Sequence, residues 1–160
     1  IGKMKAILTH IGAWAPMAEQ KAVAFFLGQK DAIKKYLAGF KTEIEERLRR
    51  IYDGFMELKA EGLPVDAIAP EAAIYLTIKI DLTGKKTPDA RLPDGQGKLL
   101  GDQGAVTAYI LNTAGLAVVP FYAFGAERDS AWYRLSVGTC KKEEIAEMTG
   151  KLREALKQLY

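Results

Sequence analysis

The sequence predicts an α+β fold of two layers, in which a small, mainly antiparallel sheet of about three strands carries helices on one face. Apolar residues recur every three or four positions over 31–60, the spacing of one long helix near the N-terminus. Three short runs, 72–81, 116–125 and 132–139, are rich in the β-branched and aromatic residues that favour strands. A last amphipathic run over 141–159 predicts a closing helix.

The N-terminal elements begin and end at residues suited to those positions. Residues 1–13 are predicted to form a short amphipathic segment followed by a turn, and 15–28 a helix with Pro16 in its first turn. Asp31 is placed to cap the long helix and Gly62 to end it. Three pairs of opposite charge, four residues apart, support its polar side: Glu43–Arg47, Glu45–Arg49 and Glu46–Arg50.

The second half of the chain contains an excursion between two predicted elements. Residues 84–101 are rich in Gly, Pro, Asp and Lys, and we expect them to form a mobile loop. A helix should follow, with Asp102 as its N-cap and Gly115 just past its end. Thr139 is predicted to cap the closing helix.

Composition describes an ordinary globular chain of one domain, 1–160. Hydrophobic residues make up 49% and charged residues 27% of its 160 residues. A net charge of +3, spread thinly, does not favour a nucleic-acid partner, and no apolar run reaches transmembrane length. The single cysteine, Cys140, cannot form a disulfide within the chain and favours a reducing, cytoplasmic compartment. The chain starts at Ile1, so we expect a piece of a longer protein, although Met4 is an alternative start.

Several chemical motifs are excluded by spacing. The stretch KIDLTGKKT has Lys79 where a phosphate-binding loop needs glycine, and GQGKLLG does not have the spacing of a dinucleotide motif. One histidine and one cysteine give no metal constellation. Cys140 and His10 could form a nucleophile–base pair, but a packed thiol is the favoured interpretation.

A charged residue in the last predicted strand is the best candidate for a binding site. Arg134 stands in WYRLSVGT without a nearby acid, and the loop VVPFYAFG places three aromatic residues after the neighbouring strand. A guanidinium beside aromatic side chains is suited to bind a carboxylate. From spacing alone, an ion pair for Arg134, core packing for the aromatic residues and a surface or turn position for His10 are favoured instead.

Four segments, in this order, resemble the C-terminal part of a class I/II aminotransferase. They are HIGAWAPMAEQKA, PEAAIYLTIKID, LNTAGLAVVPFYAFG and WYRLSVGT. This family is pyridoxal-phosphate-dependent, of the aspartate-aminotransferase type and fold type I. The resemblance covers nearly the whole chain, and the family's P-x-G-A-F-Y pattern has Ala72 at its glycine.

The resemblance implies roles for five residues. Arg134 would bind the α-carboxylate of an amino-acid substrate, and Tyr122 and Phe124 would line the substrate pocket. His10 and Trp14 would lie at the interface of a homodimer, near the active site of the neighbouring subunit. The segment 1–28 would face a large domain of the same chain.

The resemblance also implies that this chain is catalytically incomplete. In the family, a lysine in a Ser-Lys context binds pyridoxal phosphate, and no lysine here has that context. We therefore expect no catalytic residue, no metal and no bound cofactor in this chain, and an inactive fragment of an enzyme that acts on amino acids and 2-oxo acids. A free-standing carboxylate-binding or regulatory module, and a plain interaction domain with Arg134 in an ion pair, remain the alternatives.

Overall fold

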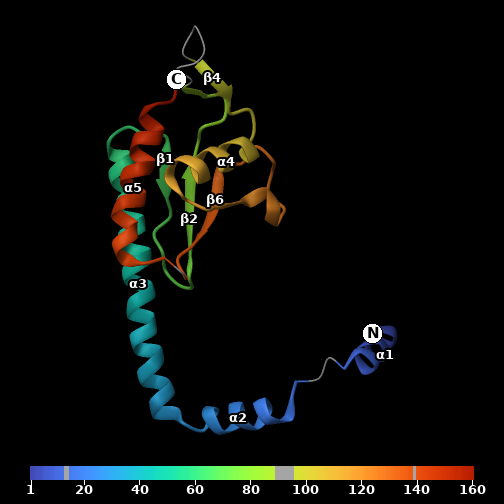
Figure 1. Cartoon of the computed structure of the whole chain (residues 1–160). Coiled ribbons are helices and arrows are strands. Elements are labelled where there is room, and N and C mark those ends of the chain that lie inside the picture. The colour runs from blue at the N-terminus through green and yellow to red at the C-terminus, as the bar shows by residue number, and fades with distance from the viewer. Residues whose placement is uncertain (13–14, 89–95, 139) are drawn as a thin grey trace. The chain divides into compact units, whose positions relative to one another are not determined.

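The computed structural model describes residues 1–12, 15–88, 96–138 and 140–160, and they form two compact units (Figure 1). The first unit is Ile1–Lys41 and the second is Thr42–Tyr160. The long helix α3, Lys30–Ala60, continues from the first unit into the second. The units therefore divide within α3, whereas the sequence predicted a single domain over 1–160 with the segment 1–28 facing a large domain.

The first unit consists of α1 (Gly2–Ile11), α2 (Met17–Leu27) and the start of α3. Neither α1 nor α2 contains a buried residue. Their large apolar side chains are exposed: Met4, Ile7, Leu8, Ile11, Met17, Val23, Phe25, Phe26 and Leu27. These two helices therefore contribute nothing to the hydrophobic core, which begins at Ile44.

The second unit contains a four-stranded antiparallel sheet in the order β1-β2-β6-β5. Its strands are β1 (Val65–Ala67), β2 (Tyr75–Ile80), β6 (Trp132–Ser136) and β5 (Val119–Pro120). The predicted three strands are present, and β1 is the additional one. The run 116–125 supplies only the short β5, because the chain turns into the 3-10 helix η1, Phe121–Phe124, after Pro120.

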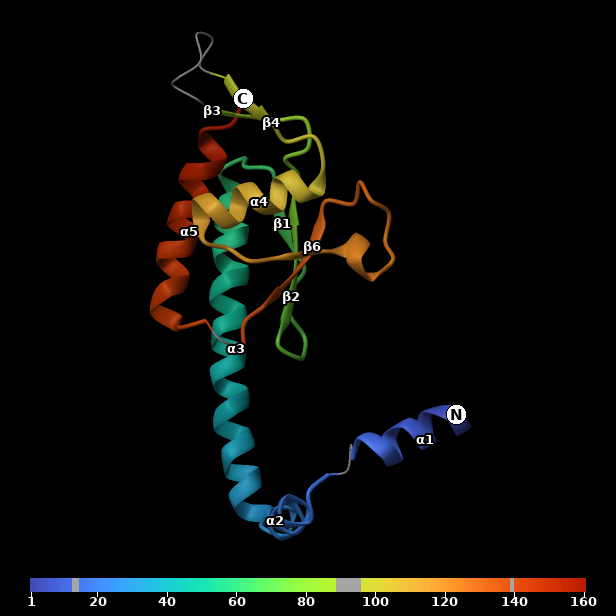
Figure 2. The same cartoon turned by 45° about the vertical axis from the view of Figure 1, so that its right-hand side comes forward.

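Alternation along β2 and β6 gives the sheet two different faces. Leu76, Ile78 and Ile80 of β2 and Tyr133 and Leu135 of β6 are buried on one face. They share a core with the second half of α3, α4 (Gln103–Ala114) and α5 (Lys142–Lys157), which lie over that face (Figure 2). The prediction of two layers with helices on one face is confirmed.

The residues predicted to end the helices fulfil that role in three places. Gly62 has φ +82°, and the amides of Gly62 and Leu63 donate to the carbonyls of Lys59 and Leu58, the pattern of a Schellman motif. The Asp102 carboxylate accepts from the amide of Ala105 at 2.8 Å, and Gly115 ends α4 at φ +69°.

Two predicted caps differ from the structure. Asp31 lies in the first turn of α3 rather than before it, because the helix begins one residue earlier, at Lys30. The N-cap position of α5 is Lys141, whose amide donates to the Glu144 carboxylate at 3.2 Å. Thr139, the predicted cap, lies outside the described residues.

The predicted excursion loop contains secondary structure. Within 84–101, β3 (Lys86–Pro88) and β4 (Gln96–Leu99) pair antiparallel as a separate two-stranded sheet. Lys86 also exchanges two backbone hydrogen bonds with Tyr160, at 3.3 and 3.2 Å. Strand pairing thus replaces an irregular loop on both sides of 89–95, which lie outside the described residues.

Helices α3 and α5 approach each other closely at a glycine. A Cβ built on Gly54 would lie 2.9 Å from Thr149 Oγ1 and 3.1 Å from its Cγ2. The Thr149 hydroxyl is fixed in turn, since it is buried and donates to the carbonyl of Ile145 at 2.9 Å. Absence of a side chain at residue 54 therefore allows the two helices to pack at this distance.

Ion pairs join the same two helices on either side of this contact. Lys142 Nζ lies 3.0 Å from Glu43 Oε1 and 2.6 Å from Glu46 Oε2. Its hydrogen bond lowers the pKa of the Glu46 carboxyl below the usual range. Near the C-terminal end of α3, Arg153 Nε lies 2.7 Å from Glu61 Oε1. The predicted pairs within α3 are also present, at 3.6, 3.8 and 2.5 Å.

We predict that Gly54→Ala destabilises the chain although alanine favours helices. Overpacking costs about 1–3 kcal/mol, more than the gain of about 1 kcal/mol in helix propensity. The free energy of unfolding, measured by denaturant titration, should therefore fall by about 1 kcal/mol. The matched control is Gly150→Ala in α5, where a new Cβ would meet nothing within 4 Å. That variant should gain up to about 1 kcal/mol.

Adding Thr149→Ala to Gly54→Ala should recover the loss, because it removes the atoms that the new Cβ meets. Equal stabilisation by Gly54→Ala and Gly150→Ala would show that the close approach of the two helices does not constrain residue 54.

Candidate functional site

Arg134 lies on the open face of the sheet, in the strand between β2 and β5. It is opposite Thr77 of β2 and Val119 of β5 in the antiparallel register. Its strand neighbours Tyr133 and Leu135 are buried against the helices, so alternation directs Arg134 to the other face. The side chain is half-buried there, which keeps its charge partly hydrated.

Two aromatic rings contact the guanidinium. The Cζ atom of Arg134 lies 4.5 Å from the ring centroid of Tyr75 and 4.3 Å from that of Phe124. Both distances are within the range of a cation–π interaction. The ring of Phe124 also meets that of Phe121 edge to face, with centroids 6.4 Å apart. The structure thus brings Arg134 and Phe124 together, as the sequence predicted.

Tyr75 was not among the predicted site residues. The register pairs it with Ser136, two residues beyond Arg134, so the two side chains are diagonal neighbours on one face. The position of Tyr75 beside Arg134 can be deduced only once the partner strand is known, since Tyr75 shares a face of β2 with Thr77, which is opposite Arg134.

The ion-pair interpretation of Arg134 is wrong for the described part of the chain. No described carboxylate forms an ion pair with its guanidinium, and no described group accepts a hydrogen bond from it. Lys79 of β2 forms an ion pair with Asp81 instead, at 3.2 Å. The N–H groups of Arg134 therefore form no hydrogen bond with another described side chain.

The other predicted site residues have different positions. Tyr122 lies in η1 and is 39% exposed, and Phe124 is 54% exposed, so neither ring is part of the core. His10 lies in the last turn of α1, in the other unit, where it is exposed. Trp14 lies outside the described residues. The role of His10 and Trp14 at a dimer interface stays a prediction.

A buried polar cluster lies behind the strand of Arg134. The Tyr133 hydroxyl donates to Oε1 of Gln103, and both residues are buried. Nε2 of Gln103 donates in turn to Thr83 Oγ1 and to the carbonyl of Asp129, each at 3.3 Å. The cluster joins β6, the start of α4 and the loop that leads into β6. A glutamine at a helix start gives no sequence signal for this role.

Burial raises the pKa of the Tyr133 hydroxyl far above its usual value, with smaller contributions from Asp81 and Tyr122. The phenol is therefore neutral at ordinary pH and acts as a hydrogen-bond donor. Burial likewise raises the pKa of the Cys140 thiol, which disfavours the thiolate, and Sγ donates to the carbonyl of Val137 at 3.5 Å. His10 belongs to the first unit and Cys140 to the second.

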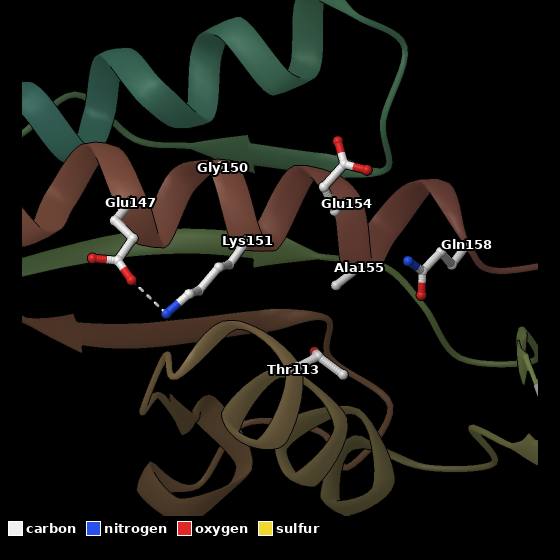
Figure 3. A pocket seen from close by; sticks show the side chains of 7 residues that line it. All are labelled: Thr113, Glu147, Gly150, Lys151, Glu154, Ala155 and Gln158. Atoms are coloured by element: carbon white, nitrogen blue, oxygen red, sulfur yellow. Dashed lines mark ion pairs between the residues drawn. The ribbon is translucent and has the colours of Figure 1, made fainter.

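One open groove lies between α4 and α5, on the helical layer (Figure 3). It is lined by Thr113, Glu147, Gly150, Lys151, Glu154, Ala155 and Gln158. Lys151 Nζ is paired with Glu147 Oε1 at 2.6 Å, so this ammonium is already neutralised. The helices cover the buried face of the sheet, whereas Arg134 lies on the open face. The groove is therefore not part of the arginine site.

No described residue is arranged to hold a covalently bound cofactor or a metal. Every described lysine is exposed except Lys79 and Lys142, which are half-buried and paired with carboxylates. Within the described ranges, no group of three His, Cys, Asp or Glu side chains could hold a metal ion. In the same part of the chain, no helix combines the length and apolar character needed to span a membrane.

Comparison with known proteins identifies the family of the chain. The family model described as aminotransferase class I and II matches residues 3–152. The chain therefore belongs to the class I and II aminotransferases, which are transferases, and the resemblance seen in its sequence is confirmed.

Individual relatives agree with this membership. The chain is 25% identical over 144 residues to a probable aspartate/prephenate aminotransferase of Rickettsia typhi, covering 89% of this chain and 31% of that protein. The aspartate aminotransferase structure of Rhizobium meliloti is 26% identical, with a TM-score of 0.61, covering 78% of this chain and 28% of that one. An aromatic aminotransferase of Pyrococcus horikoshii, 24% identical, shares the fold with a TM-score of 0.55, covering 77% and 27%. The chain thus spans less than a third of the length of these relatives.

We predict that Tyr133→Phe destabilises the chain by about 1–3 kcal/mol, because Gln103 Oε1 stays buried without its donor. Denaturant unfolding at neutral pH measures this difference. Tyr122→Phe is the matched control. The Tyr122 hydroxyl is on an exposed ring, so its removal should change the free energy of unfolding little.

The same tyrosine predicts a pH dependence. In the folded chain the pKa of Tyr133 lies above the usual value of about 10 for tyrosine. The contribution of its hydroxyl to the free energy of unfolding is therefore complete below about pH 10. It is lost above that pH, where the unfolded chain releases the phenolic proton and the folded chain does not. The loss of stability above pH 10 should be smaller in Tyr133→Phe. An identical slope in both proteins would contradict the burial of this proton.

Proposed function

We propose that this chain is the C-terminal, small domain of a pyridoxal-phosphate-dependent aminotransferase and that Arg134 anchors the α-carboxylate of its substrate. The full enzyme would transfer an amino group from an amino acid to a 2-oxo acid. Family membership and the share of its relatives that the chain spans support this proposal. The observation that carries it is an arginine on an open sheet face without an acidic partner among the described residues.

The chemistry of the guanidinium suits this role. Its planar N–H groups match the two oxygens of a carboxylate, and two parallel hydrogen bonds fix the orientation of the bound group. Because no described acid neutralises Arg134, an incoming carboxylate has no intramolecular competitor there. A carboxylate held in this way would orient the adjacent Cα–H bond, and positioning of this kind can contribute several kcal/mol to catalysis.

The residues described in this chain do not fit pyridoxal phosphate. The described lysines are exposed, or half-buried in ion pairs, so none of them lies in an enclosed site. When bound in the full enzyme, the cofactor supplies the electron sink for the reaction. We therefore propose that the large domain holds the cofactor and its lysine, and that this chain contributes the anchor.

Further partners follow from the same proposal. A homodimer, with His10 and Trp14 near the neighbouring active site, fits the aminotransferase assignment but rests on the sequence alone. A cytoplasmic location, which the single cysteine favours, is part of the same proposal.

We predict that Arg134→Ala lowers kcat/KM at least about 100-fold in an enzyme where this chain is joined to a family large domain. A charge-assisted bidentate contact is lost, and the substrate carboxylate is left without its partner. Arg134→Lys should recover only part of the activity, because an ammonium cannot form the planar pair. Steady-state transamination kinetics measure both effects.

The matched control is Arg49→Ala, an exposed arginine on the polar side of α3. Cofactor absorbance should be the same in all variants, which separates substrate anchoring from assembly of the enzyme. Unchanged kinetics in Arg134→Ala, with cofactor bound, would show that another group anchors the substrate.

We predict that this chain by itself does not bind pyridoxal phosphate at a specific lysine. After incubation with the cofactor and reduction with borohydride, peptide mass spectrometry should show low labelling spread over many exposed lysines. Saturable, stoichiometric labelling of one lysine would contradict the division of roles between the two domains.

A further inference from the structure

We propose that Tyr75 and Phe124 are positioning residues that orient the guanidinium of Arg134 for carboxylate binding. This inference rests on the proposed function of Arg134 and extends it to two residues that act through the arginine. Tyr75 had no predicted role, and Phe124 was expected only to line the substrate pocket.

The geometry shows two independent contacts on one guanidinium. The rings of Tyr75 and Phe124 have their centroids 4.5 and 4.3 Å from Cζ of Arg134. One ring comes from the start of β2 and the other from the end of η1, on opposite sides of Arg134 in the strand order. A flexible side chain with contacts to two separate elements has fewer rotamers available than one that a single neighbour contacts.

Both rings are carried by ordered elements. The backbone of Tyr75 is paired antiparallel with Ser136. Phe124 is braced by the edge-to-face contact with Phe121, at 6.4 Å, and η1 ends at Gly125, where φ is +93°. This φ lies in the left-handed region that glycine adopts without strain. The position of Phe124 is therefore set by a defined turn rather than by an irregular loop.

An aromatic ring orients an arginine without using up its binding capacity. The ring face attracts the cation, while the five N–H donors lie in the guanidinium plane and stay available for a carboxylate. An aspartate or glutamate in the same place would occupy those donors and compete with the substrate. Because part of the side-chain entropy is already lost before binding, less is lost when the carboxylate binds.

The rings are suited to this role and little suited to support the fold. Tyr75 is 43% exposed and Phe124 54% exposed, and neither belongs to the hydrophobic core. Replacing them should therefore leave the core intact and change mainly the environment of Arg134. This separation makes a direct measurement on the chain possible.

The experiment uses the whole chain, labelled with ¹⁵N and ¹³C at arginine, and pyruvate as the carboxylate probe. NMR follows the side-chain resonances of Arg134 in a titration at constant ionic strength, with chloride as the matched anion. The variants are Tyr75→Leu and Phe124→Leu, which remove a ring, and Tyr75→Phe and Phe124→Tyr, which keep it. The backbone amide spectrum of core residues such as Ile78 serves as the check on folding.

We expect the aliphatic protons of Arg134 to be shifted upfield by the rings in the parent chain and less so in each leucine variant. We also expect each leucine variant to weaken pyruvate binding about 2- to 5-fold, the effect of one exposed cation–π contact. The ring-conserving variants should bind like the parent.

Three results would overturn the proposal, and they are distinguishable. Pyruvate binding that is unchanged in both leucine variants would remove the positioning role but leave Arg134 as the anchor. Absence of the upfield shifts in the parent would show that the rings do not contact the arginine in solution. If the upfield shifts are present but the Arg134 resonances respond to pyruvate no more than to chloride, Arg134 does not anchor a carboxylate. The positioning role of the two rings would then be refuted as well.

Discussion

The antiparallel pairing of β2 with β6 is the constraint on which both the core and the candidate site depend. Five residue pairs, from Tyr75 with Ser136 to Lys79 with Trp132, fix the register. Because side chains alternate, this register buries Leu76, Ile78, Tyr133 and Leu135 under the helices and leaves Arg134 on the other face. A slip of one residue would bury the arginine and expose the core, so the core and the candidate site require the same alignment.

The surroundings of Arg134 differ in electrostatic character from the contact between α3 and α5. Between α3 and α5, cations meet carboxylates directly, as Lys142 does with Glu43 and Glu46. At Arg134 the neighbours are aromatic rings instead. Surface ion pairs contribute little to stability, so an arginine without an acidic partner among the described residues costs the fold little. This arrangement is the one that we propose leaves Arg134 able to bind a ligand carboxylate.

Much of this arrangement could be predicted from sequence because it rests on local patterns. Helical periodicity gave the long helix, and Asp102, Gly62 and Gly115 have the chemistry of helix ends. Strands with a weak local signal could not be predicted. Strand β1 has only three residues, and the hairpin of β3 and β4 lies in a stretch rich in turn residues.

The candidate site divides along the same line. Arg134 and Phe124 were identified because an arginine in an apolar strand and an aromatic loop are unusual in sequence. Tyr75 became visible only through the register of β2 against β6, which no single segment specifies. Gln103 looked like an ordinary first residue of a helix, and only its burial against Tyr133 reveals its role. Sequence thus identified unusual residues, and topology identified their neighbours.

The glycine at the crossing of α3 and α5 has a consequence for how the family can vary. Residue 54 has no space for a Cβ while residue 149 is a threonine. The size of side chain that fits at one of these positions depends on the size of the side chain at the other. In relatives that keep this helix crossing, a larger residue at the first position should therefore occur together with a smaller one at the second. The two positions, 95 residues apart in the chain, would then evolve as a pair.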